Sequence, residues 1–197
     1  RGRPKTAEPI DRSIEVADPK EESRLQRQPK MDLAAMLADL PIACDIGCKK
    51  DAQGFKRSWK GYKFHWDVTD SGIPISCILT SASLHDSQVA IPLAASSAQY
   101  VESGYEVMDA AYDAKAIRDY IHTLGHVPLI DSNPRNGEKR AFLPFEAQRY
   151  KVRSTVERAN ARLKDEFGGT TIFVKGHAKV MTHLMFGVLA LTVDTVL

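Results

Sequence analysis

The chain has 197 residues, of which 43% are hydrophobic and 26% are charged, and its formal net charge is +2. This length suggests one domain, or one domain with an attached arm, and the composition is that of an ordinary soluble globular protein. No apolar run approaches the roughly 20 residues that a membrane span requires. The N-terminus also lacks the order of segments that marks a secretory signal. We therefore expect neither secretion nor a membrane partner.

The chain carries three cysteines, Cys44, Cys48 and Cys77. An odd number in apolar surroundings is typical of a reducing compartment and not of a disulfide framework, so we expect a cytoplasmic location. Cys44 and Cys48 have a spacing that begins some zinc sites. No second cysteine pair or close histidine pair completes such a site.

Residues 1–30 are polar and contain four prolines, so they predict a flexible arm or linker. The first four, Arg-Gly-Arg-Pro, are similar to the core of a minor-groove-binding AT-hook, although a plain linker also accounts for them. The chain opens inside a basic run and without an initiator methionine. We therefore expect that an N-terminal part of the full protein is absent.

The folded part is expected to begin with a short helix over residues 31–40, followed by three strands. The strands are predicted over residues 42–48, 59–69 and 73–80, where apolar and polar side chains alternate. Asp70-Ser71-Gly72 is a turn signal, so the second and third strands should form a hairpin.

Helices and strands alternate in the rest of the chain. The expected elements are helices over residues 87–101, 114–124, from about 146 or 150 to 167, and 178–197, and strands over 105–108 and 127–130. Pro92 requires a break or a late start in the first of these helices. Three strands followed by helix, strand, helix, strand and helix predict an α/β fold, with a mixed five-stranded sheet and helices on both faces.

Basic residues gather in the last third of the chain. Between residues 135 and 179 there are 11 Lys and Arg against five Asp and Glu. Such a distribution on a nearly neutral protein favours a polyanionic partner. A solvated charged face explains it equally well, so charge alone does not decide between them.

The long helix near residue 157 carries an ordered set of polar side chains. At 100° per residue, one face within an arc of roughly 80° holds five of them, Tyr150, Arg153, Glu157, Asn160 and Lys164. The opposite side is apolar and should pack on the sheet. An ordinary amphipathic helix with an Arg153–Glu157 pair is the simplest explanation when the helix is taken by itself.

Two further carboxylates are carried by expected strands, Asp45 within residues 42–48 and Asp109 directly after residues 105–108. Asp45 follows a short apolar run, and Asp109 follows the apolar pair Val-Met. Ligand sites in α/β sheets collect at strand ends, and buried carboxylates need a partner. Together with Glu157 these residues supply hard oxygen ligands for Mg²⁺ or Mn²⁺. Two such ions, about 3.5 to 4 Å apart, support an in-line displacement at phosphorus.

The sequence resembles the DDE transposases of bacterial insertion sequences, in the branch with a Tyr-x2-Arg-x3-Glu-x6-Lys signature. The resemblance runs from about Leu33 to the C-terminus. It is carried by five segments: CDIGCKK around Asp45, SWKGYKFHWD, LTSASLHDSQ, MDAAYDA around Asp109, and YKVRSTVERANARLK around Glu157.

The resemblance implies an RNase H-like fold and a DNA transposase that cleaves element ends and transfers them to target DNA. It implies that Asp45, Asp109 and Glu157 are the catalytic residues and bind two Mg²⁺ or Mn²⁺ ions. It also implies that three signature residues contact transposon-end DNA, namely Tyr150, Arg153 and Lys164. The implied partners are double-stranded DNA, as element ends and target, and further copies of the chain in a homo-oligomer.

Two other functions stay open at this point. An RNase H-like nuclease that only hydrolyses DNA or RNA would share the three acids but would not transfer strands. A non-catalytic DNA-binding derivative of a transposase would bind no metal ion.

Some polar residues have more than one interpretation. Asp131 ends the fifth expected strand and is a reserve carboxylate for the site. Asp86 and Asp113 are each expected to cap the helix that follows them. Three residues share one strand face and either line the site or face water: Lys63, His65 and Asp67.

Overall fold

The computed structural model describes residues 22–50, 53–133 and 140–197. Strands and helices follow one another in the expected order along the chain, so the prediction of an α/β fold is confirmed. The prediction of one five-stranded sheet is wrong. The strands form a three-stranded sheet and a separate two-stranded sheet, and no ladder of hydrogen bonds joins the two within the described residues.

The three-stranded sheet is antiparallel, in the order β1 (Asp45–Lys50), β2 (Lys56–Val68) and β3 (Pro74–Ser81). The expected hairpin of β2 and β3 is present, and Gly72 adopts a φ of 87° in its turn, where a side chain would be strained. Strand β1 starts at Asp45 and not at residue 42, and it pairs with β2 as an edge strand. Asp45 therefore begins its strand, whereas the prediction places it in the middle of one.

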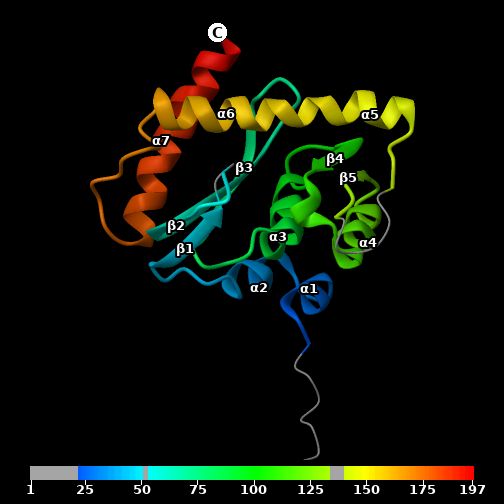
Figure 1. Cartoon of the computed structure of the whole chain (residues 1–197), viewed down its shortest axis with the longest axis horizontal. Coiled ribbons are helices and arrows are strands. Elements are labelled where there is room, and N and C mark those ends of the chain that lie inside the picture. Colours follow the sequence, from blue (N-terminus) through cyan, green and yellow to red (C-terminus); the bar gives the residue numbers. More distant parts are fainter. Residues whose placement is uncertain (1–21, 51–52, 134–139) are drawn as a thin grey trace, which may run out of the picture.

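The two-stranded sheet is parallel and consists of β4 (Tyr105–Met108) and β5 (Val127–Ile130). Parallel strands need a crossover, which is supplied by the short 3₁₀ helix η2 (Ala110–Tyr112) and by α4 (Lys115–Thr123). This β4–β5 unit is set beside the three-stranded sheet, with α3 (Ser87–Ser97) between them (Figure 1).

The register of the parallel pair brings two carboxylates together. Met108 pairs with Ile130, and the Asp131 N–H donates to the Met108 carbonyl at 3.3 Å, so the ladder continues to the ends of both strands. Asp109 and Asp131 are the next residues on each strand. They therefore occupy neighbouring positions at the same carboxyl edge of the sheet.

A long helical rod crosses the molecule beyond these strand ends (Figure 1). It consists of α5 (Pro144–Tyr150), the 3₁₀ turn η4 (Lys151–Arg153) and α6 (Ser154–Asp165), which follow without a gap. The single helix expected here is thus confirmed, with a tightened turn in its middle. Its apolar side packs on β2 and on the C-terminal helix α7 (His177–Val196) through five buried side chains, Trp66, Ala159, Leu163, Val188 and Leu191.

The N-terminal segment of the described chain is folded against α3. It forms α1 (Arg24–Arg27), the 3₁₀ helix η1 (Gln28–Lys30) and α2 (Leu33–Ala38). Leu25 packs on the core cluster that contains Ala90, Ile91 and Ile117. The expected arm thus overlaps the folded unit from residue 22, and residues 1–21 lie outside the described part of the chain.

A side chain from η1 explains how α3 continues through Pro92. Proline has no N–H, so the carbonyl of Gln88, four residues earlier, lacks its helical partner. The Gln28 side chain is fully buried and donates Nε2–H to that carbonyl at 2.8 Å. The break expected at Pro92 therefore does not occur, because the missing donor is supplied from outside the helix.

Gln28→Met should lower the free energy of unfolding by about 1 to 3 kcal/mol, because it leaves the Gln88 carbonyl, which faces the buried Gln28 side chain, without a donor. Pro92→Ala restores a helical N–H at this carbonyl, so the same Gln28 substitution should cost less in that background. Urea denaturation of the four proteins in this double-mutant cycle measures the coupling, which we expect to exceed about 0.5 kcal/mol. Additive effects would contradict this account of α3.

Helix α7 is long and largely apolar. By length and composition alone, α7 is long and apolar enough to cross a membrane. The sequence-based statement that no apolar run approaches this length is therefore wrong for α7. Buried core helices of soluble proteins meet the same requirement. Several of its residues are buried against α6, β2 and β3, including Val180, Leu184 and Val188.

A buried polar cluster is formed by Glu106 of β4, His126 and Asp67 of β2. Glu106 of β4 lies 3.0 Å (Oε1 to Nδ1) from His126, and both residues are almost fully buried. Burial, and after it the nearby carboxyl group of Asp67 on β2, raise the pKa of Glu106 to about 8. Burial likewise raises the pKa of Asp67, against a hydrogen bond from Ser97. The folded protein thus holds Glu106 in its protonated form at neutral pH.

This cluster predicts a loss of stability as the pH rises from about 4.5 to about 8. The folded-state pKa of Glu106 is about 8, against an ordinary value of 4.5. Its stabilising effect is therefore complete below the ordinary pKa and is lost as the pH rises toward 8. In urea denaturation between pH 5 and 9, Glu106→Gln should show a smaller decline in unfolding free energy than the wild type. The control is Glu102→Gln, at an exposed position, which should decline as the wild type does.

Candidate active site

An open cleft of about 2250 Å³ is bounded by β2, by β4 with the turn that follows it, and by α6 with the segment after it. Side chains of both charges line it. Asp109 and Glu157 supply carboxylates, whereas Lys63, Arg153 and Lys164 supply cations. The cleft therefore brings together acids from the strand end and from the long helix, beside groups that pair with phosphate.

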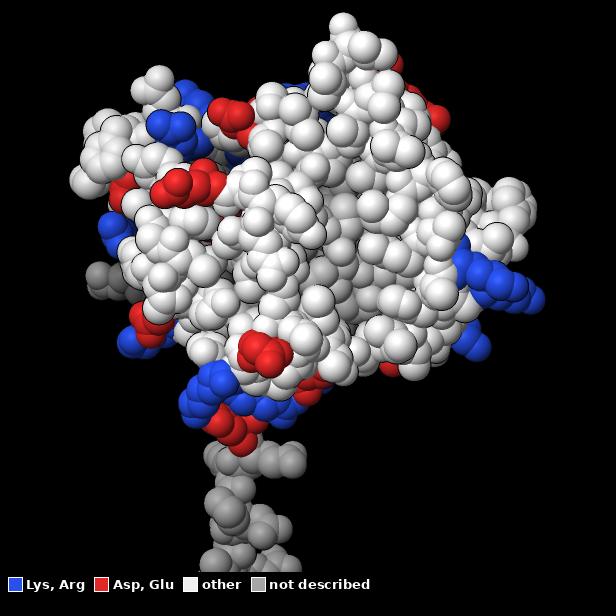
Figure 2. Space-filling view, turned by 180° about the vertical axis from the view of Figure 1, so that it is seen from behind, with Lys and Arg blue, Asp and Glu red and all other residues white. Residues whose placement is uncertain are grey.

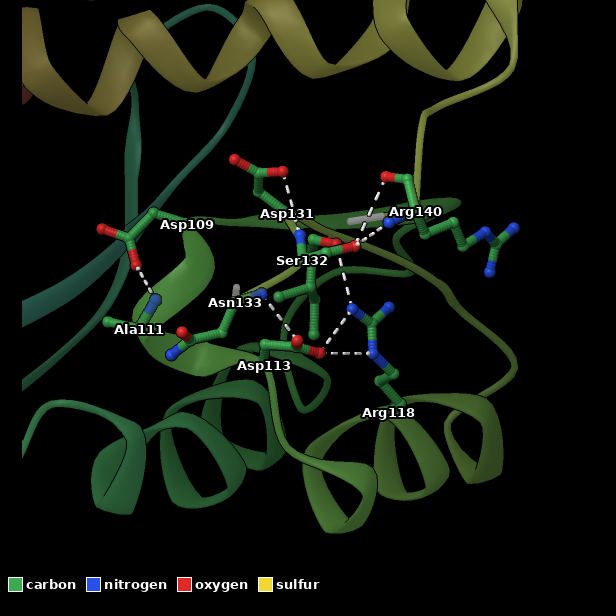
Figure 3. Close-up of polar contacts among 9 residues, drawn as sticks. Asp109, Ala111, Asp113, Arg118, Asp131, Ser132, Asn133 and Arg140 are labelled. Carbon is green, nitrogen blue, oxygen red and sulfur yellow. Dashed lines mark hydrogen bonds and ion pairs between the residues drawn. The ribbon is translucent and has the colours of Figure 1, made fainter. Parts of the chain in front are cut away.

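Asp109 lies directly after β4 and is exposed. Its Oδ1 accepts the N–H of Ala111 at 2.8 Å and thereby caps η2, so the carboxylate is held by the turn that begins at the strand end. Figure 3 shows Asp131 at the neighbouring strand end with its carboxyl group pointing toward the helix above, whereas Asp109 turns toward Ala111. Asp131 itself accepts the N–H of Ser132 at 2.9 Å.

Glu157 projects from α6 on the face that the sequence pattern predicts. Its Oε1 lies 2.8 Å from Arg153 Nη1, and the Arg153 guanidinium lies 5.8 Å from the centroid of the Tyr150 ring. Asn160 and Lys164 line the same cleft further along the helix. The Glu157 side chain is 57% exposed, and exposed pairs of this spacing contribute only about 0.2 to 0.5 kcal/mol. Glu157 can therefore exchange Arg153 for another partner at little cost.

Tyr150 ends α5 and packs beside Phe142. Its ring centroid is 4.7 Å from that of Phe142. Burial raises the pKa of the phenol, the Arg153 charge lowers it, and the charges of Asp131, Asp109 and Glu157 raise it again. The charges of those three acids therefore act on one hydroxyl group. The signature tyrosine lies at the point where the strand ends approach α6.

Asp45 lies elsewhere. It is exposed at the start of β1 and is not part of the cleft lining, although Cys44 and Cys48 of the same segment are. Hydrogen bonds from the Ser83 side chain and then from its neighbour's N–H, that of Ile46, hold the pKa of Asp45 below its usual value. The structure thus brings Asp109 and Glu157 to one cleft and leaves Asp45 beside the end of β3.

The three carboxylates suit a hard divalent ion in their chemistry but not in their arrangement here. Oxygen ligands are what Mg²⁺ and Mn²⁺ prefer. Within the described ranges, however, no three His, Cys, Asp or Glu side chains lie close enough together to hold a metal ion. The expected cluster of Asp45, Asp109 and Glu157 is therefore not assembled in this conformation.

Lys63 and His65 of β2 form polar contacts with the end of β3 and with the segment after it. The sequence does not decide whether these residues line the site or face water. Lys63 Nζ donates to the Leu84 carbonyl at 2.7 Å and to Asp86 Oδ1 at 2.9 Å. Asp86 therefore pairs with Lys63 and does not cap α3 through its side chain. Burial lowers the pKa of His65 to about 4, so the ring is neutral at pH 7, 3.0 Å from Thr80 Oγ1. The alternation of side chains along β2 predicts that Lys63, His65 and Asp67 share one face of the strand. The fold shows in addition that all three line the cleft.

Two substitutions of Asp109 separate its structural role, as the cap of η2, from any role in the reaction. Asp109→Ala removes the acceptor for the Ala111 N–H and should lower the unfolding free energy by about 1 kcal/mol. Asp109→Asn keeps an acceptor oxygen and should lie within about 0.5 kcal/mol of the wild type, since Asn and Asp are similar caps. Urea denaturation of both variants measures the difference. Equal losses in the two would show that the cap does not hold this turn.

Comparison with known proteins places these features in a family. The model of the transposase DDE domain matches residues 47–193, which is more than half of the chain and includes Asp109 and Glu157. Asp45 lies just ahead of the matched span. No curated protein matches the chain, and no solved structure matches it either. The chain belongs to the transposase DDE domain family.

Proposed function

We propose that the chain is the catalytic part of a DNA transposase, which cleaves the ends of a mobile element and joins them to target DNA. In both steps a water molecule or a DNA 3′-hydroxyl attacks a backbone phosphorus in line with the oxygen that leaves. Family membership supports a transposase that acts on DNA, and it implies an RNase H-like fold. The catalytic residues of the proposal are Asp45, Asp109 and Glu157.

The observation that carries the proposal is the convergence of Asp109 and Glu157 on one cleft. They come from different walls, a strand end and a helix, and the charges of both act on the Tyr150 hydroxyl. Two carboxylates held at a lined cleft are a common basis for chemistry at a phosphodiester, because they can orient a nucleophile and a leaving group. In the proposal, Glu157 leaves Arg153 when DNA enters.

The cations of the cleft support a DNA substrate. Arg153 and Lys164 lie on the same helix face as Glu157, so a strand held at the carboxylates also meets both. Seen from behind, much of the surface carries no charged side chains, and those present gather mainly toward its edges (Figure 2). A polyanion finds few cations on that face. DNA binding through phosphates should weaken steeply with added salt.

The transposase DDE family generally uses a divalent metal ion, and in the proposal this is Mg²⁺ or Mn²⁺, with two ions per site. Asp45 would join Asp109 and Glu157 as a ligand only in a conformation that moves it into the cleft. Assembly as a homo-oligomer on DNA is part of the proposal. The exposed apolar side chains of α7 support it, including Phe186, Leu189 and Val193.

A non-catalytic DNA-binding derivative of a transposase is the second candidate. The position of Asp45 outside the cleft favours it, because the full set of acids is not gathered. Such a protein would bind element DNA through its cations. It would neither cleave DNA nor transfer strands in the presence of Mg²⁺ or Mn²⁺.

Glu157→Gln should reduce cleavage of element-end DNA by at least about 100-fold with Mn²⁺ present, because it removes a charge that the proposal places at the reacting phosphate. Folding and DNA affinity should change little, since the Arg153 pair is exposed. A gel assay of strand cleavage and a titration of labelled DNA measure the two effects.

The matched control is Glu166→Gln. Glu166 forms an i,i+4 pair with Arg162 at the C-terminal end of the same helix, at 3.1 Å, and its side chain is 51% exposed. This variant should cleave at the wild-type rate. Full activity of Glu157→Gln would refute the assignment, and a wild-type chain that binds DNA but neither cleaves nor transfers it would favour the second candidate.

A further inference from the structure

We propose that Arg118 and Asp113 are positioning residues, which hold the two strand-end loops of the β4–β5 unit in one fixed arrangement. Asp113 lies between η2 and α4, and Arg118 lies in the second turn of α4. The inference rests on the proposed function, because it concerns how Asp109 is oriented for the reaction.

The two side chains form a forked ion pair. Arg118 donates to Asp113 Oδ1 from Nε at 3.2 Å and from Nη2 at 2.8 Å. The side chains are only 28% and 15% exposed, so water screens the pair less than it screens a surface pair. Arginine is suited to this role because its planar fork fixes the direction of the carboxylate as well as its distance.

The pair reaches beyond its own loop to β5. Arg118 Nη2 also donates to the carbonyl of Ile130, the last residue of that strand, at 3.0 Å. The second oxygen of Asp113, Oδ2, accepts the N–H of Asn133 at 2.8 Å (Figure 3). One ion pair is thus tied by two hydrogen bonds to the chain on both sides of Asp131.

The same pair fixes the loop that carries Asp109. Asp113 follows η2 directly, and η2 is capped at its other end by Asp109. Anchoring Asp113 to Ile130 and Asn133 therefore sets the position of Asp109 relative to Asp131. If the pair served only to begin α4, it would not need the contacts with the end of β5.

The sequence predicts that Asp113 caps α4, but the structure gives its carboxylate a different role. The N-cap residue of α4 is Ala114, whose side chain forms no capping hydrogen bond. Both oxygens of Asp113 instead bind groups of α4 and of the loop after β5. The carboxylate thus joins the two loops.

The test is Arg118→Ala in the whole chain, with hydrogen–deuterium exchange of the backbone as its first measurement. Exchange should become at least about tenfold faster in peptides covering residues 109–113 and 131–133, and it should stay unchanged in β2 and α6.

In cleavage of element-end DNA by Arg118→Ala, kcat should fall by about 10- to 100-fold, because small displacements of reacting groups reduce the rate by that much. The dissociation constant for DNA should stay within about twofold. Arg118→Lys, which keeps the charge but not the fork, should recover only part of kcat.

Arg24→Ala is the matched control. Arg24 Nε lies 2.7 Å from Asp39 Oδ2, with side chains 22% and 20% exposed, in the helices at the opposite end of the molecule from α6 (Figure 1). It should lower stability as Arg118→Ala does while leaving kcat and the exchange of both loops unchanged.

Unchanged loop exchange in Arg118→Ala, or an equal loss of kcat in Arg24→Ala, would overturn the inference. If the loops exchange faster in Arg118→Ala but the wild type cleaves no DNA, the positioning role stands and the proposed function fails.

Discussion

The parallel register of β4 and β5 is the constraint that positions the carboxylates at the strand ends. Because Met108 pairs with Ile130 and the ladder runs on to Asp131, the two strands end level with each other. Whatever follows each strand must then lie at the same edge of the sheet, and in this chain both positions are aspartates. The crossover through α4 enforces this arrangement, since parallel neighbours cannot be joined by a tight turn. The acidic edge is therefore a consequence of backbone pairing, and the side chains around it only refine its geometry.

The long helix completes the site because its two sides have different roles. Ala159 and Leu163 are buried against Trp66 and α7, which fixes the rotation of the helix about its axis. Once that rotation is set, the spacing of 3.6 residues per turn directs Glu157 into the cleft. The pair with Arg153 holds Glu157 only weakly, whereas the apolar side holds the helix firmly. A rigid support and an exchangeable carboxylate are what a site for a charged substrate requires.

Local patterns in the sequence predicted most of the elements, because alternation and helical periodicity depend on neighbours in the chain. The β2–β3 hairpin, the β4 and β5 strands and the polar face of α6 all follow from such patterns. Pairings between distant segments were not predictable in this way. The separation of β1 from β4, the bond from Gln28 to the Gln88 carbonyl, and the ion pair of Asp113 with Arg118 depend on contacts that no local spacing encodes. The place of Asp45 depends on such contacts too, because the sequence predicts it within a strand over residues 42–48 whereas β1 begins at it.

The central claim is that Asp109 and Glu157 act on the same phosphate, and a double-mutant cycle of strand cleavage tests it most directly. Rates are measured for the wild type, Asp109→Asn, Glu157→Gln and the double variant on element-end DNA with Mn²⁺. Groups that act as one unit lose nearly all activity with the first substitution, so the double variant should be about as slow as either single one. Losses that multiply, or a single variant that keeps the wild-type rate, would show that the two carboxylates do not share a site.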